Sequence, residues 1–273
     1  MYDYSATFAC YNNVAYTQQC INSLLQTGFP MRQLVVVDNH SQDDTLDYLH
    51  SVNGLHVIAN RSNMGCGVAW NQGILALQTE WTVIMNNDIV VSPGWVESLI
   101  EQAIQLNLKV ASPAYLEGSL NYDFIGSAQQ FKQTMHGYAR FGYAHAICLL
   151  VHRSVWQEVG YFRATPKLLG FEDTIFFNDL RKAGIQQACL ANSWIHHFGS
   201  VTVKAMNQAH REKTGEKQMA NRYNYRVLHQ SFLERKWRKF LKKRAISLAK
   251  AHELNQFGIT LHGVRDETTF RWF

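Results

Sequence analysis

The sequence lacks the features of a secreted protein, a membrane-spanning protein or a zinc ribbon. Its five cysteines are scattered and none forms a Cys-x-x-Cys pair, which argues against a disulfide scaffold or a zinc ribbon and favours a reducing compartment. No apolar run approaches the length that crosses a bilayer. The first residues show no basic segment followed by an apolar one, so we expect no signal peptide and a cytoplasmic location.

Charge and proline are also scarce, whereas apolar residues are abundant. Hydrophobic residues make up 47% of the 273 residues, charged residues 17%, and only 4 residues are proline. This composition excludes a disordered chain and suffices for one large α/β domain, or for one domain with a helical appendage. The net charge of +5 is uneven, because Arg235–Lys250 holds eight Lys or Arg and no acid. This segment predicts a polyanionic partner, such as a membrane surface, for the tail only.

The first half of the chain alternates β-branched runs with helical stretches. The expected strands are 5–9, 33–38, 55–59, 81–85 and 110–114, and the expected helices are 14–26, a segment from about 43, 67–77 and 94–106. Such alternation predicts βαβ units, and nearly continuous apolar strands are typical of a sheet that is covered on both faces. The fold class is therefore α/β, with a mostly parallel central sheet flanked by helices.

The second half of the chain is less regular. We expect a strand at 147–152, helices at 154–159 and 172–183, and long polar helices at roughly 218–252, whereas 115–143 is hard to assign. A soft boundary near Val203 divides the chain into a first domain, 1–203, and a basic helical extension, 204–273. The extension is too short for a large core of its own, so we expect it to pack on the first domain.

Polar residues follow several of the expected strands, at the edge where parallel sheets collect ligands. Tyr11 and Asn12 follow the first strand, Asp38 ends the second, and Asn86-Asn87-Asp88 follows the fourth. Asp38 can accept hydrogen bonds from a base or a ribose, or it can merely shape its turn. Asp88 can bind Mg²⁺ or Mn²⁺ together with phosphate and water, or it can simply start the next turn.

A glycine-rich segment, Asn63-Met64-Gly65-Cys66-Gly67, precedes Asn71 and opens a helix. Glycine lets the backbone approach a ligand, and a helix N-terminus favours an anion. The spacing matches neither a Walker loop nor Gly-x-Gly-x-x-Gly, which argues against a P-loop NTPase and a dinucleotide dehydrogenase.

Two pairs of titratable residues occur later in the chain. Glu172-Asp173 opens a helix among phenylalanines, which would raise the pKa of a carboxylate into the range of a general base; the helix dipole alone also favours acids there. His196-His197 follows an apolar run, and these residues can bind a metal or a diphosphate, or they can be ordinary surface or capping histidines.

Together these motifs resemble glycosyltransferase family 2, whose members have the nucleotide-sugar-binding GT-A fold. The resemblance covers about residues 4–203 and also runs through Val35–Ser41, Gly160-Tyr161-Phe162 and His197–Ser200. It rests on the order and spacing of several modest motifs. It implies inverting transfer of a sugar from a nucleotide-diphosphate sugar to a hydroxyl of a glycan, lipid-linked or protein acceptor, as in polysaccharide biosynthesis, with Mg²⁺ or Mn²⁺ as the cofactor.

The resemblance also implies roles for single residues. Asp38 would contact the base, Asn86 would lie near the ribose, and Asp88 would bind the metal. His197 would support the metal or the diphosphate, with His196 as the alternate. Asp173 would be the catalytic base, with Glu172 as the alternate. The other expected residues of the nucleotide-sugar pocket are Ala9, Tyr11, Asn12, Asn63, Gly65, Asn71 and Asn87.

Two positions depart from the family pattern. Asn86-Asn87-Asp88 has one carboxylate where the family's metal motif has two, which puts metal dependence in doubt. This departure leaves a second function open, that of a non-catalytic module that binds a nucleotide or a glycan. Many members carry an acid two residues after the Glu-Asp pair, and here that position is Ile175, which concentrates the base role on Asp173.

The basic segment Arg235–Lys250 has two interpretations. With Trp237, Phe240, Leu241 and Ile246 among its cations, it fits an amphipathic helix that lies on an anionic membrane, peripherally at its inner face. The alternative, favoured because surface helices often have apolar stripes, is a helix that packs this stripe on the catalytic domain. Nucleic-acid binding lacks a recognised motif, so we expect no nucleic-acid partner.

Overall fold

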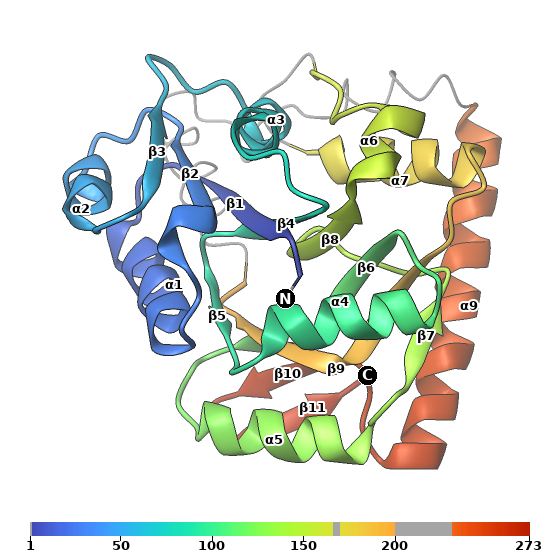
Figure 1. The fold of residues 1–273 in the computed structure, drawn as a ribbon. Helices are drawn as coiled ribbons and strands as arrows, with labels where there is room; N and C mark the ends of the chain where they lie inside the picture. The colour runs from blue at the N-terminus through green and yellow to red at the C-terminus, as the bar shows by residue number, and fades with distance from the viewer. Residues whose placement is uncertain (1, 166–169, 200–230) are drawn as a thin grey trace, which may run out of the picture.

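The computed structural model describes residues 2–165, 170–199 and 231–273, which form a central sheet with helices around it (Figure 1). The strands are β1 (Tyr4–Cys10), β2 (Leu34–Asp38), β3 (His56–Ala59), β4 (Trp81–Asn86), β5 (Ile89–Val91), β6 (Val110–Gly118), β7 (Ala139–Phe141), β8 (Cys148–His152), β9 (Gln187–His197), β10 (His262–Asp266) and β11 (Thr269–Trp272). The helices are α1 (Val14–Gln26), η1 (Met31–Gln33), α2 (Thr45–Ser51), α3 (Cys66–Ala76), α4 (Trp95–Gln105), α5 (Phe124–Thr134), α6 (Arg153–Val159), α7 (Glu172–Lys182) and α9 (Phe232–Phe257).

The strand order explains how the sheet is built. It runs β11-β10-β6-β8-β4-β1-β2-β3, and β9 pairs with β6 and with the short strands β5 and β7. The strands β4, β1, β2 and β3 are parallel neighbours, as the alternation of strands and helices predicts. The expected α/β sheet with flanking helices is confirmed, but the sheet is not purely parallel, because β8 returns between β4 and β6 against their direction. Among the described strands, five of ten pairings are antiparallel, so the α/β sheet is mixed.

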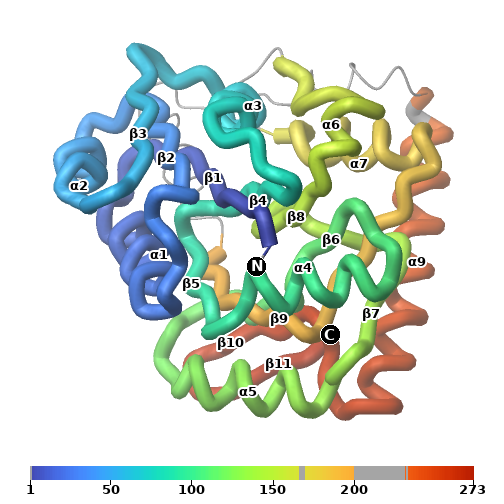
Figure 2. Tube along the Cα trace, in the orientation of Figure 1, coloured from blue at the N-terminus to red at the C-terminus, as the bar shows by residue number. Residues whose placement is uncertain are grey.

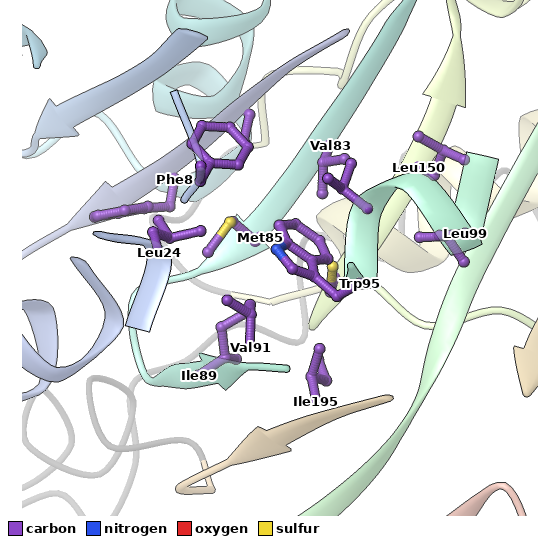
Figure 3. Close-up of a cluster of buried hydrophobic side chains, with 14 of the residues drawn as sticks. Phe8, Leu24, Val83, Met85, Ile89, Val91, Trp95, Leu99, Leu150 and Ile195 are labelled. Atoms are coloured by element: carbon purple, nitrogen blue, oxygen red, sulfur yellow. The ribbon is translucent and has the colours of Figure 1, made fainter. Parts of the chain in front are cut away.

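Apolar side chains cover both faces of the sheet. Val83 and Met85 of β4 join one buried cluster, with residues of α1 and α4 such as Leu24 and Leu99 (Figure 3). Ile84, between them in the sequence, joins a second cluster with α3, α6 and α7. Successive residues of a strand point to opposite faces, so a strand between two layers must be apolar throughout. This packing explains the uninterrupted run Val83-Ile84-Met85.

The end of the chain adds strands as well as a helix. We expected a helical extension, but β10 and β11 form a hairpin that continues the sheet, with β10 parallel to β6. The pattern of His262–Trp272 is too short and too mixed in polarity to predict strands by itself. The boundary near Val203 and the expected helical residues 218–230 lie outside the described residues, so the division into 1–203 and 204–273 remains a prediction.

A buried ion pair joins α9 to the rest of the fold. Arg140 Nε of β7 donates to Glu253 Oε1 at 2.7 Å, and the backbone N–H of Leu261 donates to Glu253 Oε2 at 3.1 Å. Close by, Phe257 packs edge-on against the ring of Tyr138. Because a buried charge that loses its partner costs about 3–5 kcal/mol, these contacts hold the C-terminal end of α9 firmly to the body.

Two observations bear on the expected redox compartment and on the expected lack of a membrane-spanning segment. All five cysteines lie within the described residues and all are free. Within the same residues, none of the helices combines the length and apolarity that crossing a bilayer requires.

Candidate active site

The strand ends that we singled out in the sequence meet at one edge of the sheet. Cys10, the last residue of β1, pairs with Asp38 of β2, and Ala9 pairs with Asn86 of β4 on the other side. Tyr11 and Asn12 continue from β1 at the same edge. The parallel pairing therefore brings together the first, second and fourth expected strand ends.

Asn12 ties the loop after β1 to the loop after β2. Its N–H donates to Ser41 Oγ at 2.8 Å, and its Oδ1 accepts from the N–H of Gln42 at 2.7 Å. Asp38 is buried and its Oδ2 accepts from the N–H of Ser41 at 3.2 Å. Asp38 thus shapes its own turn, as the more ordinary interpretation proposed.

Asn39 fixes the glycine-rich loop in front of α3, a role that we did not assign from the sequence. Its Nδ2 donates to Asn63 Oδ1 at 3.0 Å, and its Oδ1 accepts from the N–H of Met64 at 2.9 Å. Asn63 Oδ1 also accepts from the N–H of Gly65 at 3.0 Å. Gly65 has φ +81°, which favours glycine. The amide-rich composition of these loops was the available signal for this network.

Close packing places α3 between β1 and α7. A Cβ added to Gly73 would lie 1.8 Å from Thr7 Oγ1, so only glycine lets α3 approach β1 this closely. At the other end of α3, a Cβ on Gly67 would touch Glu172 at 3.4 Å. These contacts bring the glycine-rich loop against the start of α7.

The side chain of Asn71 makes two structural hydrogen bonds. Its Nδ2 donates to the carbonyl of Phe162 at 2.8 Å, and its Oδ1 accepts from the N–H of Phe162 at 3.0 Å. Phe162 packs in turn against Trp70 and Phe176. Asn71 thus holds the segment after α6 against α3.

The turn from β4 into β5 carries the remaining predicted donor-site residues. Asn87 is buried, and its Nδ2 donates to Thr17 Oγ1 of α1 at 3.0 Å. Asp88 and His197 become neighbours because β5 pairs with the end of β9, where Ile89 lies opposite His197. In addition, the N–H of Phe198 donates to the carbonyl of Asp88 at 3.0 Å. The structure therefore joins the metal-motif aspartate to the late histidine.

His197 lies between two carboxylates. Its Nε2 is 3.3 Å from Asp88 Oδ1, and its Nδ1 is 3.4 Å from Glu117 Oε2 at the end of β6. Burial alone would lower the pKa of His197, but hydrogen bonds to Asp88 and Glu117, and their charges, raise it to about 9. Glu117 is a member of this site that sequence reasoning missed, because it lies in a region that we could not assign.

His196 faces the other side of β9. Its Nδ1 is 3.0 Å from the hydroxyl of Tyr122, and its Nε2 is 3.1 Å from the carbonyl of Gly118. A carbonyl can only accept, so Nε2 donates and Nδ1 accepts, as in a neutral imidazole. Burial lowers the pKa of His196 to about 4, which agrees with a neutral ring. Because both ring nitrogens of His196 are engaged, whereas His197 lies beside Asp88, His197 is the better metal-ligand candidate.

Asp88 and His197 fit a metal that is shared with a diphosphate. No group of three or more His, Cys, Asp or Glu side chains suited to a metal occurs in the part of the chain that the structure describes. A carboxylate and an imidazole side by side suit Mn²⁺ or Mg²⁺ when phosphate oxygens and water complete the coordination. Glu117 would then orient the ring of His197 from its other nitrogen, as carboxylates behind metal-binding histidines do.

The two acids at the start of α7 differ in exposure. Glu172 is buried, and its Oε1 accepts from the N–H of Gly170 at 3.0 Å. Asp173 is only partly buried, and its Oδ1 accepts from the N–H of Thr174 at 2.6 Å. Burial, together with the charge of Asp173, raises the pKa of Glu172 to about 6. Asp173 therefore has the better access, and Glu172 the more strongly perturbed carboxylate.

The perturbed carboxyl of Glu172 predicts a pH-dependent effect of Glu172→Gln on stability. Because the folded-state pKa of about 6 exceeds the ordinary 4.5, ionisation of Glu172 lowers the free energy of unfolding as the pH rises through this window. Gln cannot ionise. Between acid pH and a pH above this window, we therefore expect the difference in the free energy of unfolding to shift by up to ~2 kcal/mol in favour of the variant over the unaltered chain. Urea unfolding across the window measures this; a difference that is flat with pH would contradict it.

Three of the predicted site carboxylates influence the pKa of one thiol. Burial raises the pKa of Cys66, at the start of α3, and the charges of Glu172, Asp173 and Asp88 raise it further. All three carboxylates thus lie within electrostatic reach of Cys66. On the neighbouring strands, the pKa of Cys10 is raised by burial and by the charge of Asp38. Asp38 and Asn86 thus lie at one edge of the sheet, and Glu172 lies against Gly67 at the start of α3.

Comparisons with known proteins agree with the resemblance seen in the sequence. Glycosyl transferase family 2 matches residues 5–170. An uncharacterised glycosyltransferase of Haemophilus influenzae is 24% identical over 117 residues, 41% of this chain and 36% of that protein. Glycosyltransferase GlyG of Streptococcus pneumoniae is 23% identical over 134 residues, 46% of this chain and 44% of that protein. The matched stretch thus spans less than half the length of these curated relatives.

Two solved structures share the fold. One is GalNAc-T7 with UDP, GalNAc and Mn²⁺, with a TM-score of 0.57 and 12% identity over 72% of this chain and 44% of that chain. The other is S. aureus TarS 1–349 in complex with UDP-GlcNAc, with a TM-score of 0.53 and 16% identity over 71% of this chain and 58% of that chain. The mixed sheet with flanking helices is the GT-A fold that the resemblance implied. With more than half of its residues matched, the chain belongs to glycosyl transferase family 2.

Proposed function

We propose that this chain transfers a sugar from a UDP-sugar to an acceptor hydroxyl by a single, inverting displacement assisted by Mg²⁺ or Mn²⁺. The observation that carries this proposal is the meeting of the ends of β1, β2 and β4, which places Asp38 and Asn86 at one edge of the sheet, with Asp88 beside His197. UDP is proposed because the two structural neighbours above are complexes with UDP and UDP-GlcNAc. The family membership supports transferase chemistry.

In this proposal Asp173 is the base. The acceptor oxygen forms a bond to the anomeric carbon while the bond from that carbon to the diphosphate oxygen breaks, and the acceptor proton passes to the Asp173 carboxylate. Attack opposite the leaving group inverts the anomeric centre. The hydrogen bond from Thr174 holds one carboxylate oxygen and sets the direction of the other. Glu172 remains the alternate base.

Asp88 and His197 would hold the metal against the diphosphate. When bound, the ion supplies Lewis-acid neutralisation of the charge on the leaving group. Asp88 presents a buried carboxylate, and Glu117 keeps the ring of His197 turned toward it. Both carboxylates favour positive charge at this position, and His197 would lose its ring proton when it binds the ion.

The nucleotide would lie over the carboxyl ends of β1, β2 and β4. Asp38 is proposed for the base and Asn86 for the vicinity of the ribose, and the network from Asn39 to Asn63 keeps the adjoining loop in place. The rest of the proposed pocket comprises Ala9, Tyr11, Asn12, Gly65 and Asn87, with Asn71 supporting it through Phe162. A glycan or a lipid-linked molecule is the proposed acceptor class.

A non-catalytic module that binds a nucleotide or a glycan is the second candidate. The observation that favours it is the single carboxylate of Asn86-Asn87-Asp88, together with the absence, within the described residues, of a group of three or more His, Cys, Asp or Glu side chains suited to a metal. Such a module would bind the donor without turnover.

A donor screen tests the proposed function. Thermal unfolding is measured with a panel of nucleotide sugars and Mn²⁺, because a ligand that binds the folded state raises the unfolding temperature. We expect stabilisation by a UDP-sugar, followed by release of UDP when acceptors are added. Binding without UDP release under any acceptor condition would favour the non-catalytic module, and no stabilisation by any nucleotide sugar would contradict both candidates.

A further inference from the structure

The helix α9 exposes an apolar stripe on the side that faces away from the molecule. The stripe consists of Leu233, Trp237, Phe240, Leu241 and Leu248, which recur at the three- and four-residue intervals of one helix face. Their exposed fractions are 76%, 63%, 54%, 45% and 64%. Side chains of this size are normally buried when a helix packs on its own domain.

The contacts of α9 with the body come from its other side. Glu253 is fully buried in its pair with Arg140, and Trp237 precedes it by about four and a half helical turns, so the two side chains point in roughly opposite directions. Lys242 also turns inward, with its ammonium group 5.7 Å from the ring centroid of Tyr143. For Trp237, Phe240 and Leu241 the expected alternative, in which the apolar stripe packs on the catalytic domain, is therefore not what the structure shows, whereas Ile246 is half-buried.

The position of α9 leaves the stripe accessible along its length. Figures 1 and 2 show α9 along one edge of the molecule, with the sheet and the other helices on one side of it. The ion pair of Glu253 and the packing of Phe257 hold its C-terminal end, and Lys242 contacts Tyr143 midway along it. The stripe thus lies on the exposed part of a helix whose orientation is fixed by its anchored end.

Cations accompany the stripe and indicate what covers it. Lys243 and Arg244 are exposed, and Arg244 lies within the stripe between Leu241 and Leu248. No acid occurs from Arg235 to Lys250, where the chain has eight Lys or Arg. A second copy of the same helix would bring these cations against each other, whereas an anionic lipid surface would attract them and accept the apolar side chains.

We propose that α9 lies on an anionic membrane surface, with Leu233, Trp237, Phe240, Leu241 and Leu248 inserted among the lipids. Long basic side chains beside the stripe can reach the headgroups while their methylene groups stay in apolar surroundings. The anchored end of the helix then sets how the catalytic body sits over the membrane. This inference goes beyond the proposed function, because it does not depend on which donor or acceptor the site takes.

Trp237 provides a direct reporter for the proposed contact. All seven tryptophans lie within the described residues, and Trp237 is the only exposed one among them. With the full chain we expect co-sedimentation with vesicles of equal parts phosphatidylglycerol and phosphatidylcholine, and a blue shift of tryptophan emission as Trp237 leaves water. Vesicles of phosphatidylcholine alone, or high salt, should weaken both signals because the cations then lose their partners.

A pair of matched variants assigns the contact to the stripe. Leu241→Glu combined with Leu248→Glu adds acids to the stripe and keeps Trp237, and we expect at least about tenfold weaker vesicle binding. Ile104→Glu adds one acid, half the charge of the double variant, at a comparably exposed site on α4, with 50% of Ile104 accessible, and should bind like the unaltered chain. Stabilisation by the donor, measured on the same variants, should be unchanged and reports separately on the proposed function.

Several results would overturn this proposal. One is an absence of binding to anionic vesicles by the unaltered chain, as expected if another part of the chain covers the stripe. Another is equal loss of binding in the Ile104→Glu variant, or sedimentation without a change in tryptophan emission. A dimer that dissociates in the Leu241→Glu/Leu248→Glu variant, with no vesicle binding, would assign the stripe to a second copy.

Discussion

Asp173→Asn is expected to lower the rate of sugar transfer by roughly 10²–10⁴-fold while donor binding stays nearly intact. The acceptor hydroxyl has a very high pKa, so its attack needs a group that takes the proton, and an amide cannot do so at neutral pH. Asp173 is partly accessible at the start of α7, and its Oδ1 already accepts from Thr174, so Asn can keep this contact. The measurement compares UDP release with donor binding by calorimetry.

Two further variants make this result specific. Asp179→Asn removes a carboxylate from the same helix, one that pairs with Arg163 at 2.8 Å, and should leave the transfer rate nearly unchanged. Glu172→Gln tests the alternate base. Normal turnover in Asp173→Asn would refute the assignment, and loss of turnover in Glu172→Gln alone would transfer the base role to Glu172.

The framework of the site follows from local sequence patterns. The runs Val35–Asp38 and Val83–Met85 are apolar enough to mark strands covered on both faces, and helices intervene between them. Right-handed connections between such units place the strands in parallel, with their carboxyl ends together. The predicted meeting of Asn12, Asp38 and Asn86 at one edge therefore needs no long-range information beyond this rule.

The catalytic side of the site depends on pairings that local patterns do not encode. The three-residue strand β5 is too short for periodicity to reveal, yet its pairing with β9 brings Asp88 to His197. The extension of β6 beyond the expected 110–114 likewise places Glu117 behind His197. Both contacts join residues far apart in the sequence, and the family resemblance supplied only the first of them.

A motif also does not determine in which direction a side chain points. The amide of Asn71 sits in a motif typical of the family, but its side chain bonds to the backbone of Phe162. For α9, the spacing of Trp237 and Leu241 reveals a stripe but not the side that faces the body. That side is set by Glu253 and its buried partner Arg140, which no local pattern connects.

Asp88→Asn is expected to abolish the effect of Mn²⁺ on donor affinity, with at least about tenfold weaker binding of the UDP-sugar in the presence of the metal. Asp88 is the only carboxylate of its motif, so its replacement leaves a neutral amide where the ion would bind, and His197 loses a partner at 3.3 Å. Mn²⁺ binding followed by electron paramagnetic resonance gives a readout that is independent of turnover.

Graded variants separate the metal ligand from its support. Glu117→Gln keeps a hydrogen-bonding group near His197 Nδ1 but removes the charge behind it, so we expect a smaller loss of Mn²⁺ affinity than in Asp88→Asn. Asp47→Asn, on the exposed surface of α2, removes one carboxylate away from the site and should change nothing. Identical donor titrations with Mn²⁺ and with EDTA in the unaltered chain would rule out the metal role, because donor affinity would then not depend on an ion.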